Sequence, residues 1–363
     1  SPRELMKAAL HNVWCEPAPS GEWNDIYSAI HSSLPFELEK KAPTEANRMG
    51  SYAGEIDPEL LEDSRYSASA LEQYADCPFA YFVGEVLGLA EWDEAQEGFD
   101  ALSAGSIWHE ILAAFLSRYR GRKLDSNEEE RYAQELIDLL DAAVTRRERQ
   151  GRVVPDVWWR FEKPRWEKAL RNWLAGELDR QRQTELTPTF FEWAFGANFR
   201  KGCDPASVER PLVLTGDENI EPVELQGKVD RIDSGGEQLR IMDYKTGKPP
   251  SRRQVEQGLR LQVPLYMMAA EALLGKQGET TADGLYVQVG AATSELELPG
   301  AKISREELLE ISRQSVLRYV AGIRRGKFPP QPAEECPSWC RARTFCRREA
   351  APDGEETEEA TDE

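Results

Sequence analysis

The sequence predicts an α/β fold, a central mixed sheet flanked by helices, with an all-helical insertion. Alternating apolar residues, typical of half-buried strands, recur at 189–199, 211–214, 225–233, 239–246 and 284–289. Apolar residues at helical spacing lie at 67–77, 101–119, 128–150, 164–183, 252–274 and 304–325. Of these, 128–150 and 164–183 follow one another without a strand between them, and we expect them to form the insertion.

Composition indicates a packed, water-exposed protein. Hydrophobic residues make up 40% of the 363 positions and include ten tryptophans, which excludes wholesale disorder. No apolar run approaches the roughly 20 residues of a membrane span, and no secretory signal opens the chain. We therefore expect no membrane contact and a cytoplasmic location.

The two ends differ in composition from the middle. Residues 1–63 begin without an initiator methionine and close on a polar stretch broken by prolines and glycines, which indicates a connection and linker. Residues 351–363 are predicted to form a disordered tail, because the stretch 353–363 carries seven acidic side chains and one alanine as its apolar content. The folded domain is expected at 64–350.

One hairpin combines several charged residues. The strands at 225–233 and 239–246 flank a glycine-containing reversal. Asp243 and Lys245 are two apart, so they share a strand face with Cα atoms roughly 7 Å apart. With a loop of about four residues, Asp230 would lie nearly opposite Asp243. Two acids and a lysine then converge.

This convergence favours a divalent-cation site. Mg²⁺ and Mn²⁺ prefer hard oxygen ligands and keep positions open for water and phosphate oxygens. Lys245 could orient or deprotonate an attacking water, or neutralise charge in a transition state. The alternative is a surface hairpin with an ordinary ion pair, which base rates favour for an isolated D-x-K pattern.

The motifs resemble those of RecB-family PD-(D/E)XK nucleases, whose fold is restriction-endonuclease-like. The resemblance runs from about residue 65 to 348 and is carried by Gly227-x-x-Asp230-Arg-Ile-Asp233, Asp243-Tyr-Lys245-Thr-Gly247, Gly105-x-x-x-His109-x-x-Leu112 and Gln262-x-x-x-Tyr266. It implies that Asp230, Asp243 and His109 bind Mg²⁺ or Mn²⁺. It also implies that Lys245 is catalytic and that Gln262 and Tyr266 support the site near the DNA strand.

One further acid and four cysteines are candidate metal ligands. Glu192, inside the strand at 189–199, could point toward the metal site or be an exposed strand residue. Cys336, Cys340 and Cys346 are clustered, which in a cytosolic protein suggests a metal rather than disulfides, and Cys77 is the best fourth ligand. The cysteine arrangement is similar to that of AddB-type nucleases and implies a 4Fe–4S cluster. Zinc also accepts four cysteines and stays open.

The resemblance implies a metal-dependent exonuclease that acts on single-stranded DNA ends. By likeness to AddB-type and actinobacterial helicase-nucleases, residues 1–63 would connect it to a helicase-like region, and the assembly would process double-strand breaks for recombinational repair. The net charge of −20 suggests that a helicase domain or partner subunit delivers the DNA. The alternatives are a catalytically silent DNA-binding subunit and a structure-selective endonuclease.

Overall fold

The computed structural model describes a large part of the chain, as two compact units. The larger unit comprises Ser64–Glu72 and Trp92–Val320, and the other comprises Ser1–Asp63, Gln73–Glu91 and Ala321–Glu363. Within them the structure describes residues 56, 58, 61, 65–89, 101–149, 157–197, 202–216, 221–275, 280–290, 294–331, 336, 340 and 346. The domain boundaries predicted at 63 and 350, the body of the N-terminal connection and the acidic tail lie outside the described residues.

The larger unit is built on a mixed sheet, which confirms the predicted fold class. Its strands among the described residues are β1 (Tyr66–Ser67), β2 (Thr187–Phe195), β3 (Leu212–Leu214), β4 (Val223–Gly235), β5 (Gln238–Lys245), β6 (Thr281–Gln288) and β7 (Glu295–Leu298). The long strand β4 pairs with β1 and β3 near its start and with β2 and β5 toward its end. The β1–β4 and β5–β6 pairs are parallel, and the others are antiparallel.

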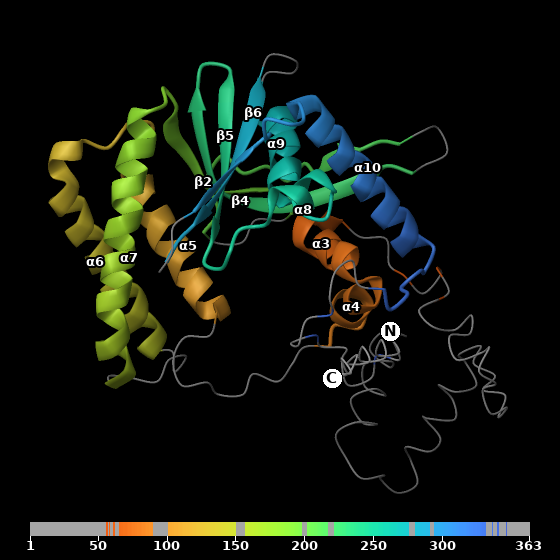
Figure 1. Cartoon of the computed structure of the whole chain (residues 1–363), viewed down its shortest axis with the longest axis horizontal. Coiled ribbons are helices and arrows are strands. Elements are labelled where there is room, and N and C mark those ends of the chain that lie inside the picture. The colour runs from red at the N-terminus through yellow and green to blue at the C-terminus, as the bar shows by residue number, and fades with distance from the viewer. Residues whose placement is uncertain are drawn as a thin grey trace, which may run out of the picture. The chain divides into compact units, whose positions relative to one another are not determined.

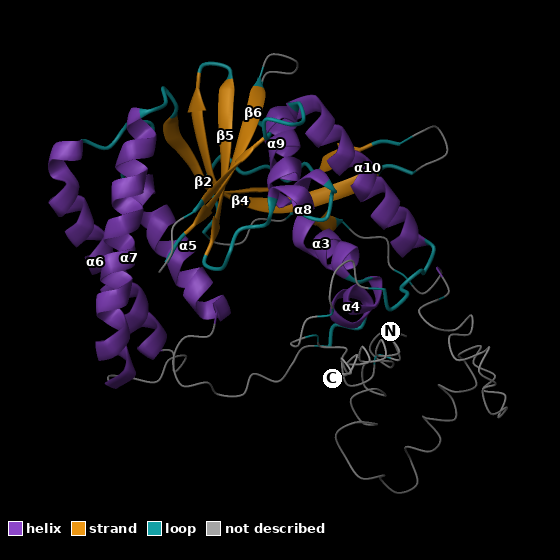
Figure 2. Cartoon of the chain, in the orientation of Figure 1, coloured by secondary structure: helices purple, strands orange, loops and turns teal. Residues whose placement is uncertain are grey.

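Helices lie on both faces of the sheet, as Figures 1 and 2 show. The helices and helical turns are α3 (Ala68–Asp76), α4 (Pro78–Tyr81), η3 (Phe82–Val86), α5 (Ala101–Ser117), η4 (Ser126–Glu128), α6 (Glu129–Arg149), α7 (Val157–Arg182), α8 (Arg252–Glu256), α9 (Gln262–Leu273) and α10 (Arg305–Arg324). Helix α5 packs on β2 and β4, with α6 and α7 beyond it, whereas α9 packs on β5 and β6. No helix in the described ranges combines the length and apolarity that crossing a bilayer would need.

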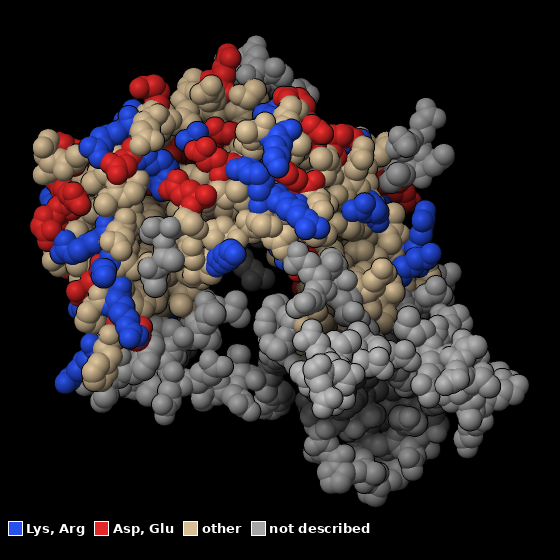
Figure 3. Space-filling model, in the orientation of Figure 1, with Lys and Arg blue, Asp and Glu red and all other residues tan. Residues whose placement is uncertain are grey.

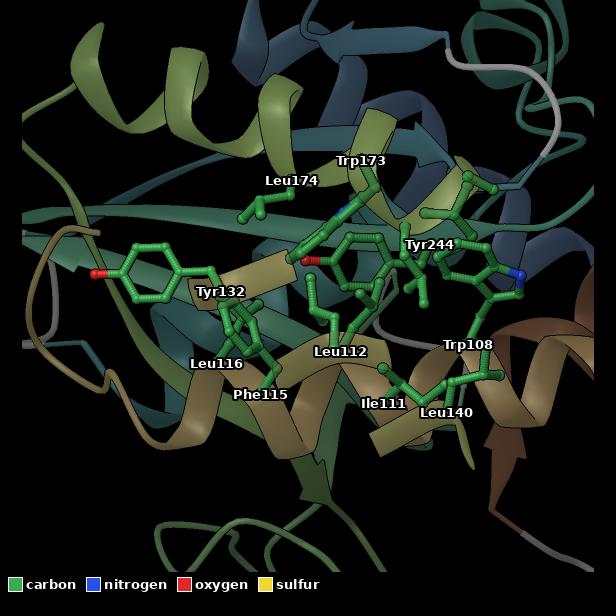
Figure 4. Packing of buried hydrophobic residues seen from close by; sticks show 14 of the residues in the cluster. Trp108, Ile111, Leu112, Phe115, Leu116, Tyr132, Leu140, Trp173, Leu174 and Tyr244 are labelled. Atoms are coloured by element: carbon green, nitrogen blue, oxygen red, sulfur yellow. The ribbon is translucent and has the colours of Figure 1, made fainter. Parts of the chain in front are cut away.

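The main core lies between the sheet and the predicted helical insertion. Apolar side chains of α5, α6 and α7 interlock there with Met242 and Tyr244 of β5 and with Leu285 and Val287 of β6. Figure 4 shows Trp108, Phe115, Trp173 and Tyr244 converging in this layer. Because side chains alternate along a strand, burying Met242 and Tyr244 here directs Asp243 and Lys245 to the opposite side.

Helix α9 approaches the other face of the sheet closely because a glycine makes room for it. A Cβ on Gly284 of β6 would collide with Val263 and with Met267 of α9. Ile241 and Tyr286 are buried in the same region. This close approach brings the start of α9 next to the end of β5, where Lys245 lies.

The smaller unit contains an aromatic cluster. Tyr74, Tyr81 and Phe82 pack around Phe328 with ring centroids 5.3 to 6.2 Å apart. The hydroxyl of Tyr74 also donates a hydrogen bond to the carbonyl of Lys327 at 2.8 Å. These contacts join two segments that are about 250 positions apart in the sequence.

The structure differs from two local predictions, and two strands were missed. The hairpin between β4 and β5 turns over Gly236 and Glu237, two residues rather than about four, although the register is the expected one. The segment 252–274, expected as a long helix interrupted near Pro264, forms two helices, α8 and α9. The break precedes Pro264, which lies in the first turn of α9 as its fixed φ allows. Strands β1 and β7 were not predicted.

Candidate active site

The site forms where β4 and β5 separate. Their last ladder pair is Arg231 with Met242, so the register sets Asp230 opposite Asp243 one step further on. Instead of a backbone bond there, the Asp230 carboxylate accepts a hydrogen bond from the Tyr244 amide at 2.9 Å. The register thus sets the two acids opposite each other, as the spacing predicts, and the charge of Asp230 acts on Asp243.

Helix α5 contributes His109 to the same point. Its Nδ1 lies 3.0 Å from Asp230 Oδ1, and its Nε2 lies 3.1 Å from the Tyr244 carbonyl oxygen. Burial alone would lower the pKa of His109, but the hydrogen bond and charge of Asp230 outweigh it and raise the pKa to about 9. The imidazolium then donates to both oxygens. It supplies positive charge beside an otherwise acidic group.

Strand β2 adds a third carboxylate to the row. The pairs on either side of Glu192 set it opposite Asp230 across β2 and β4. One ligand atom each from His109, Glu192 and Asp230 lies within 4.8 Å of the others. The interpretation of Glu192 as an extra acid thus agrees with the geometry, although the side chain also pairs with Lys228.

The backbone at Glu192 is held in a left-handed conformation. Its φ is 55°, a region that a residue with a side chain rarely adopts and that costs on the order of 1 kcal/mol or more. The loop after β2 holds it there. Asp204 donates its amide to the Glu192 carbonyl at 3.1 Å and accepts from the Phe191 amide at 3.0 Å. Such stored strain is typical of functional positions.

Asp243 is the most buried of the three acids. The residue is 1% exposed. Burial, and after it the charge of Asp230, raise the pKa of Asp243 to about 7. Lys245 offsets part of this rise, because its Nζ lies 2.7 Å from Asp243 Oδ2. At Asp243, burial and the charge of Asp230 thus outweigh the nearby cations, and a divalent cation would relieve the repulsion between the two acids.

Helix α9 reaches the site through Gln262. The Lys245 ammonium donates a hydrogen bond to Gln262 Oε1 at 2.6 Å. One helical turn later, Tyr266 is buried and its ring packs on Gly227, where a Cβ would come within 2.7 Å of the ring. Gln262 thus contacts Lys245 directly, whereas Tyr266 packs on the β4 backbone at Gly227.

One residue of the site escaped the sequence reasoning. Glu72 of α3 accepts hydrogen bonds through Oε1 from the amides of Leu261 and Gln262 at 2.7 and 2.8 Å. Its position in the predicted first helix carries no local signal, because the partners are 189 and 190 positions away.

The four cysteines predicted to bind a cluster belong to the smaller unit. Burial raises the pKa of the Cys77 thiol, and Cys340 and Cys346 are near enough to raise it further. The structure thus places Cys77 close to two of its three predicted partners. Cys336 is exposed.

A cleft of about 870 Å³ opens over the site in the larger unit. His109, Glu192 and Lys245 line it, with the cations Arg120, Lys228 and Lys248 among the remaining lining residues. A smaller hollow of about 520 Å³ shares Lys245 and Lys248 and extends toward Glu72 and Gln262. Glu192 and Lys245 therefore face a ligand held in the cleft, whereas Asp230 and Asp243 are buried next to them.

Comparisons with known proteins agree with this geometry. Residues 65–347 match the PD-(D/E)XK nuclease superfamily. Over 280 residues the chain is 29% identical to an ATP-dependent helicase/deoxyribonuclease subunit from Moorella thermoacetica, and the match covers 71% of this chain and 23% of that protein. The proteins of the same name from Clostridium perfringens and Caldanaerobacter subterraneus are each 27% identical, over 64% and 63% of this chain and 20% and 19% of their own lengths. The chain thus spans about a fifth of the length of these relatives, and it belongs to the PD-(D/E)XK nuclease superfamily.

Proposed function

We propose that this chain hydrolyses DNA phosphodiester bonds with the help of a divalent metal ion. The observation that carries the proposal is the row of Glu192, Asp230 and Asp243 across three neighbouring strands, with Lys245 beside it. An acidic row next to a lysine, with Glu192 and Lys245 lining an open cleft, matches what metal-assisted phosphoryl chemistry requires.

Asp230 and Asp243 would hold the ion, with His109 and Glu192 as further ligands. Oxygen-rich ligands of this kind suit Mg²⁺ or Mn²⁺. When bound, the ion supplies Lewis-acid polarisation of a phosphoryl oxygen and a more acidic water. As a ligand His109 would have to lose one of its two N–H protons, which are donated to Asp230 from Nδ1 and to the Tyr244 carbonyl from Nε2, because only neutral imidazole binds a metal.

Lys245 is positioned to act on the reacting phosphate. Its side chain is 33% exposed in the cleft, and its ammonium is fixed between Asp243 and Gln262. From there it can orient the attacking water or stabilise negative charge that builds on the phosphoryl oxygens. Gln262 restricts the ammonium to one position, and preorganised charge of this kind contributes most to catalysis.

We propose single-stranded DNA ends as the substrate. The relatives are named helicase/deoxyribonuclease subunits, so the chain would act as the nuclease part of a cytoplasmic helicase-nuclease in double-strand break repair. On the face of the molecule seen in Figure 3, Lys and Arg are interspersed with Asp and Glu over the described residues. Several arginines form ion pairs with acids: Arg118 pairs with Glu135, and Arg146 and Arg147 pair with Glu110. Because these arginines are already paired with acids, they attract DNA less, which favours delivery of the DNA by a partner.

Incubation of the purified chain with end-labelled single-stranded DNA and Mg²⁺ or Mn²⁺ tests the proposal. We expect metal-dependent shortening from one end and no cutting of a closed circular single strand. Cutting of the circle would indicate an endonuclease. Binding without any cutting, with either metal, would indicate a silent DNA-binding subunit and would overturn the proposal.

We further propose that Cys77, Cys336, Cys340 and Cys346 hold one 4Fe–4S cluster with an architectural role. Proximity of Cys77 to Cys340 and Cys346 supports it. A metal that joins positions so far apart in sequence would limit the unfolded chain and stabilise the fold. We expect iron and sulfide in protein purified without oxygen, and loss of both with lower stability in Cys77→Ala. Cys203→Ser is the matched control. Zinc without iron or sulfide would overturn the cluster.

A further inference from the structure

The first turn of α9 is capped by a side chain from another helix. The amides that open a helix lack partners within it and need acceptors. Leu261, at the capping position, is fully buried and offers no side-chain acceptor. Glu72 Oε1 fills this role for the Leu261 and Gln262 amides, and the Tyr286 hydroxyl accepts from the Val263 amide at 3.3 Å. Three successive amides are thus held by α3 and β6.

The capped turn carries the residue that holds the lysine. Gln262 receives the Glu72 bond at its amide and the Lys245 bond at its side chain. Lys245 in turn lies against Asp243. A continuous series of contacts therefore runs from Glu72 through both ends of Gln262 to the ammonium and the buried carboxylate.

The charge of Glu72 also acts on this region. Burial raises the pKa of Glu72, while the two amides and the charges of Arg260 and Lys245 lower it. A largely buried carboxylate is costly unless it is hydrogen-bonded and compensated. Here both conditions are met by groups of α9, the residue before it and the lysine. Lys245 thus has acids on two sides, Asp243 and Glu72.

We infer that Glu72 is a positioning residue of the nuclease centre, which fixes Gln262 and thereby sets the location of the Lys245 ammonium. The inference rests on the proposed function for its catalytic meaning, but the geometry can be tested without catalysis. Nothing in the sequence pattern around Glu72 assigns it this role.

The kinetic test compares Glu72→Ala with Glu72→Gln. Alanine leaves two amides without an acceptor, and we expect kcat to fall about 10- to 100-fold, the usual effect of losing a residue that orients a ligand, with KM nearly unchanged. Glutamine keeps a carbonyl oxygen for both amides and should restore most of kcat. Glu237→Ala, an exposed acid in the β4–β5 turn, is the matched control.

A double-variant cycle separates positioning from general support. If Glu72 acts through Gln262, then adding Glu72→Ala to Gln262→Ala should lower kcat little beyond the single Gln262 variant. Equal losses in both backgrounds would overturn the inference, and so would an unchanged kcat in Glu72→Ala.

A readout independent of cleavage uses the reactivity of Lys245. Its side chain is partly exposed, so an amine-reactive reagent followed by peptide mass spectrometry measures how firmly the ammonium is held. We expect faster labelling of Lys245 in Glu72→Ala and unchanged labelling of Lys163, which pairs with Asp141 elsewhere. Equal labelling of Lys245 in parent and variant would overturn the inference. A parent chain that cuts no DNA would instead overturn the proposed function and leave this measurement readable.

Discussion

Two groups of buried acids meet at the β4–β5 hairpin, and the pKa values of Glu177 in one and Asp243 in the other shift in opposite directions. In one, Glu177 of α7 and Asp233 of β4 surround Arg231, which is fully buried and bonds Asp233 at 2.6 and 2.8 Å and Glu177 at 2.7 Å. The other group is the row that contains Asp230 and Asp243. Asp230 and Arg231 are adjacent in sequence, so alternation along β4 separates the two groups.

Glu177 and Asp243 are both buried, and the charges around each carboxylate distinguish them. Burial would raise the pKa of Glu177, but Arg231 and then Arg180 outweigh it and lower the pKa to about 2. For Asp243 burial and the neighbouring Asp230 act together and raise the pKa to about 7. An acid cluster that the protein neutralises with its own arginines is structural. One in which two acids repel each other beside an open cleft has a use for a further cation.

The largest expected effect is loss of cleavage on removing the charge of Asp243. Asp243→Asn should lower kcat by about 10³-fold or more, because a metal ligand and its electrostatic contribution are lost. The fold should persist, since the side chain keeps its size and the lost ion pair with Lys245 is offset by the lost repulsion with Asp230. Asp233→Asn, in the neutralised group, is the control and should keep its metal-dependent activity in the folded fraction. Near-normal cleavage by purified Asp243→Asn would falsify the site assignment.

The neutralised group should respond in stability instead. Arg231→Met leaves Asp233 buried without its bonded cation and Glu177 with Arg180 alone. Removing one partner of such a buried group costs about 3–5 kcal/mol of the free energy of unfolding. Urea denaturation measures it. Arg240→Met is the matched control, because its pair with Asp283 is partly exposed and should contribute less than about 1 kcal/mol. Similar losses in both variants would contradict the distinction between the two groups.

The sequence predicts those parts of the site that depend on local residue spacing. The spacing of Asp243 and Lys245 and the glycine reversal defined the hairpin and its register. Helical spacing put His109 on a core-facing helix, and Gln262 one turn before Tyr266. Each of these follows from a period of 2 or 3.6 residues.

The remaining parts depend on tertiary contacts. Glu72 meets amides about 190 positions away. Glu192 reaches the row through a left-handed backbone that Asp204 stabilises, which no alternation pattern encodes. The short strands β1 and β7 form by pairing with β4 and β6. The break before α9 arises because Leu261 is buried and Glu72 supplies the cap.

Acid should weaken the fold through Glu177. Because its folded pKa of about 2 lies below the ordinary value near 4.3, its ionised form stabilises the protein above about pH 4.3. That contribution, about 3 kcal/mol, should be lost as the pH falls from about 4.3 to 2. In Glu177→Gln the free energy of unfolding should change less across this window, although the variant starts from a lower value. An equally steep acid dependence in both proteins would show that other carboxylates dominate.

The smallest effect is expected for His109. A neutral imidazole contributes less to Mg²⁺ binding than a carboxylate does, so His109→Ala should lower activity about 10- to 100-fold at limiting metal. Raising the Mn²⁺ concentration should recover much of it, because Asp230 and Asp243 remain. Titration of the metal against initial cleavage rate measures this shift. Glu110→Ala, the neighbouring residue on α5, removes an ion pair with Arg146 and Arg147 and should leave the titration unchanged. An unaltered metal requirement in His109→Ala would contradict this role. The imidazole would then serve only to bridge Asp230 and the Tyr244 carbonyl, much as Arg231 bridges Glu177 and Asp233.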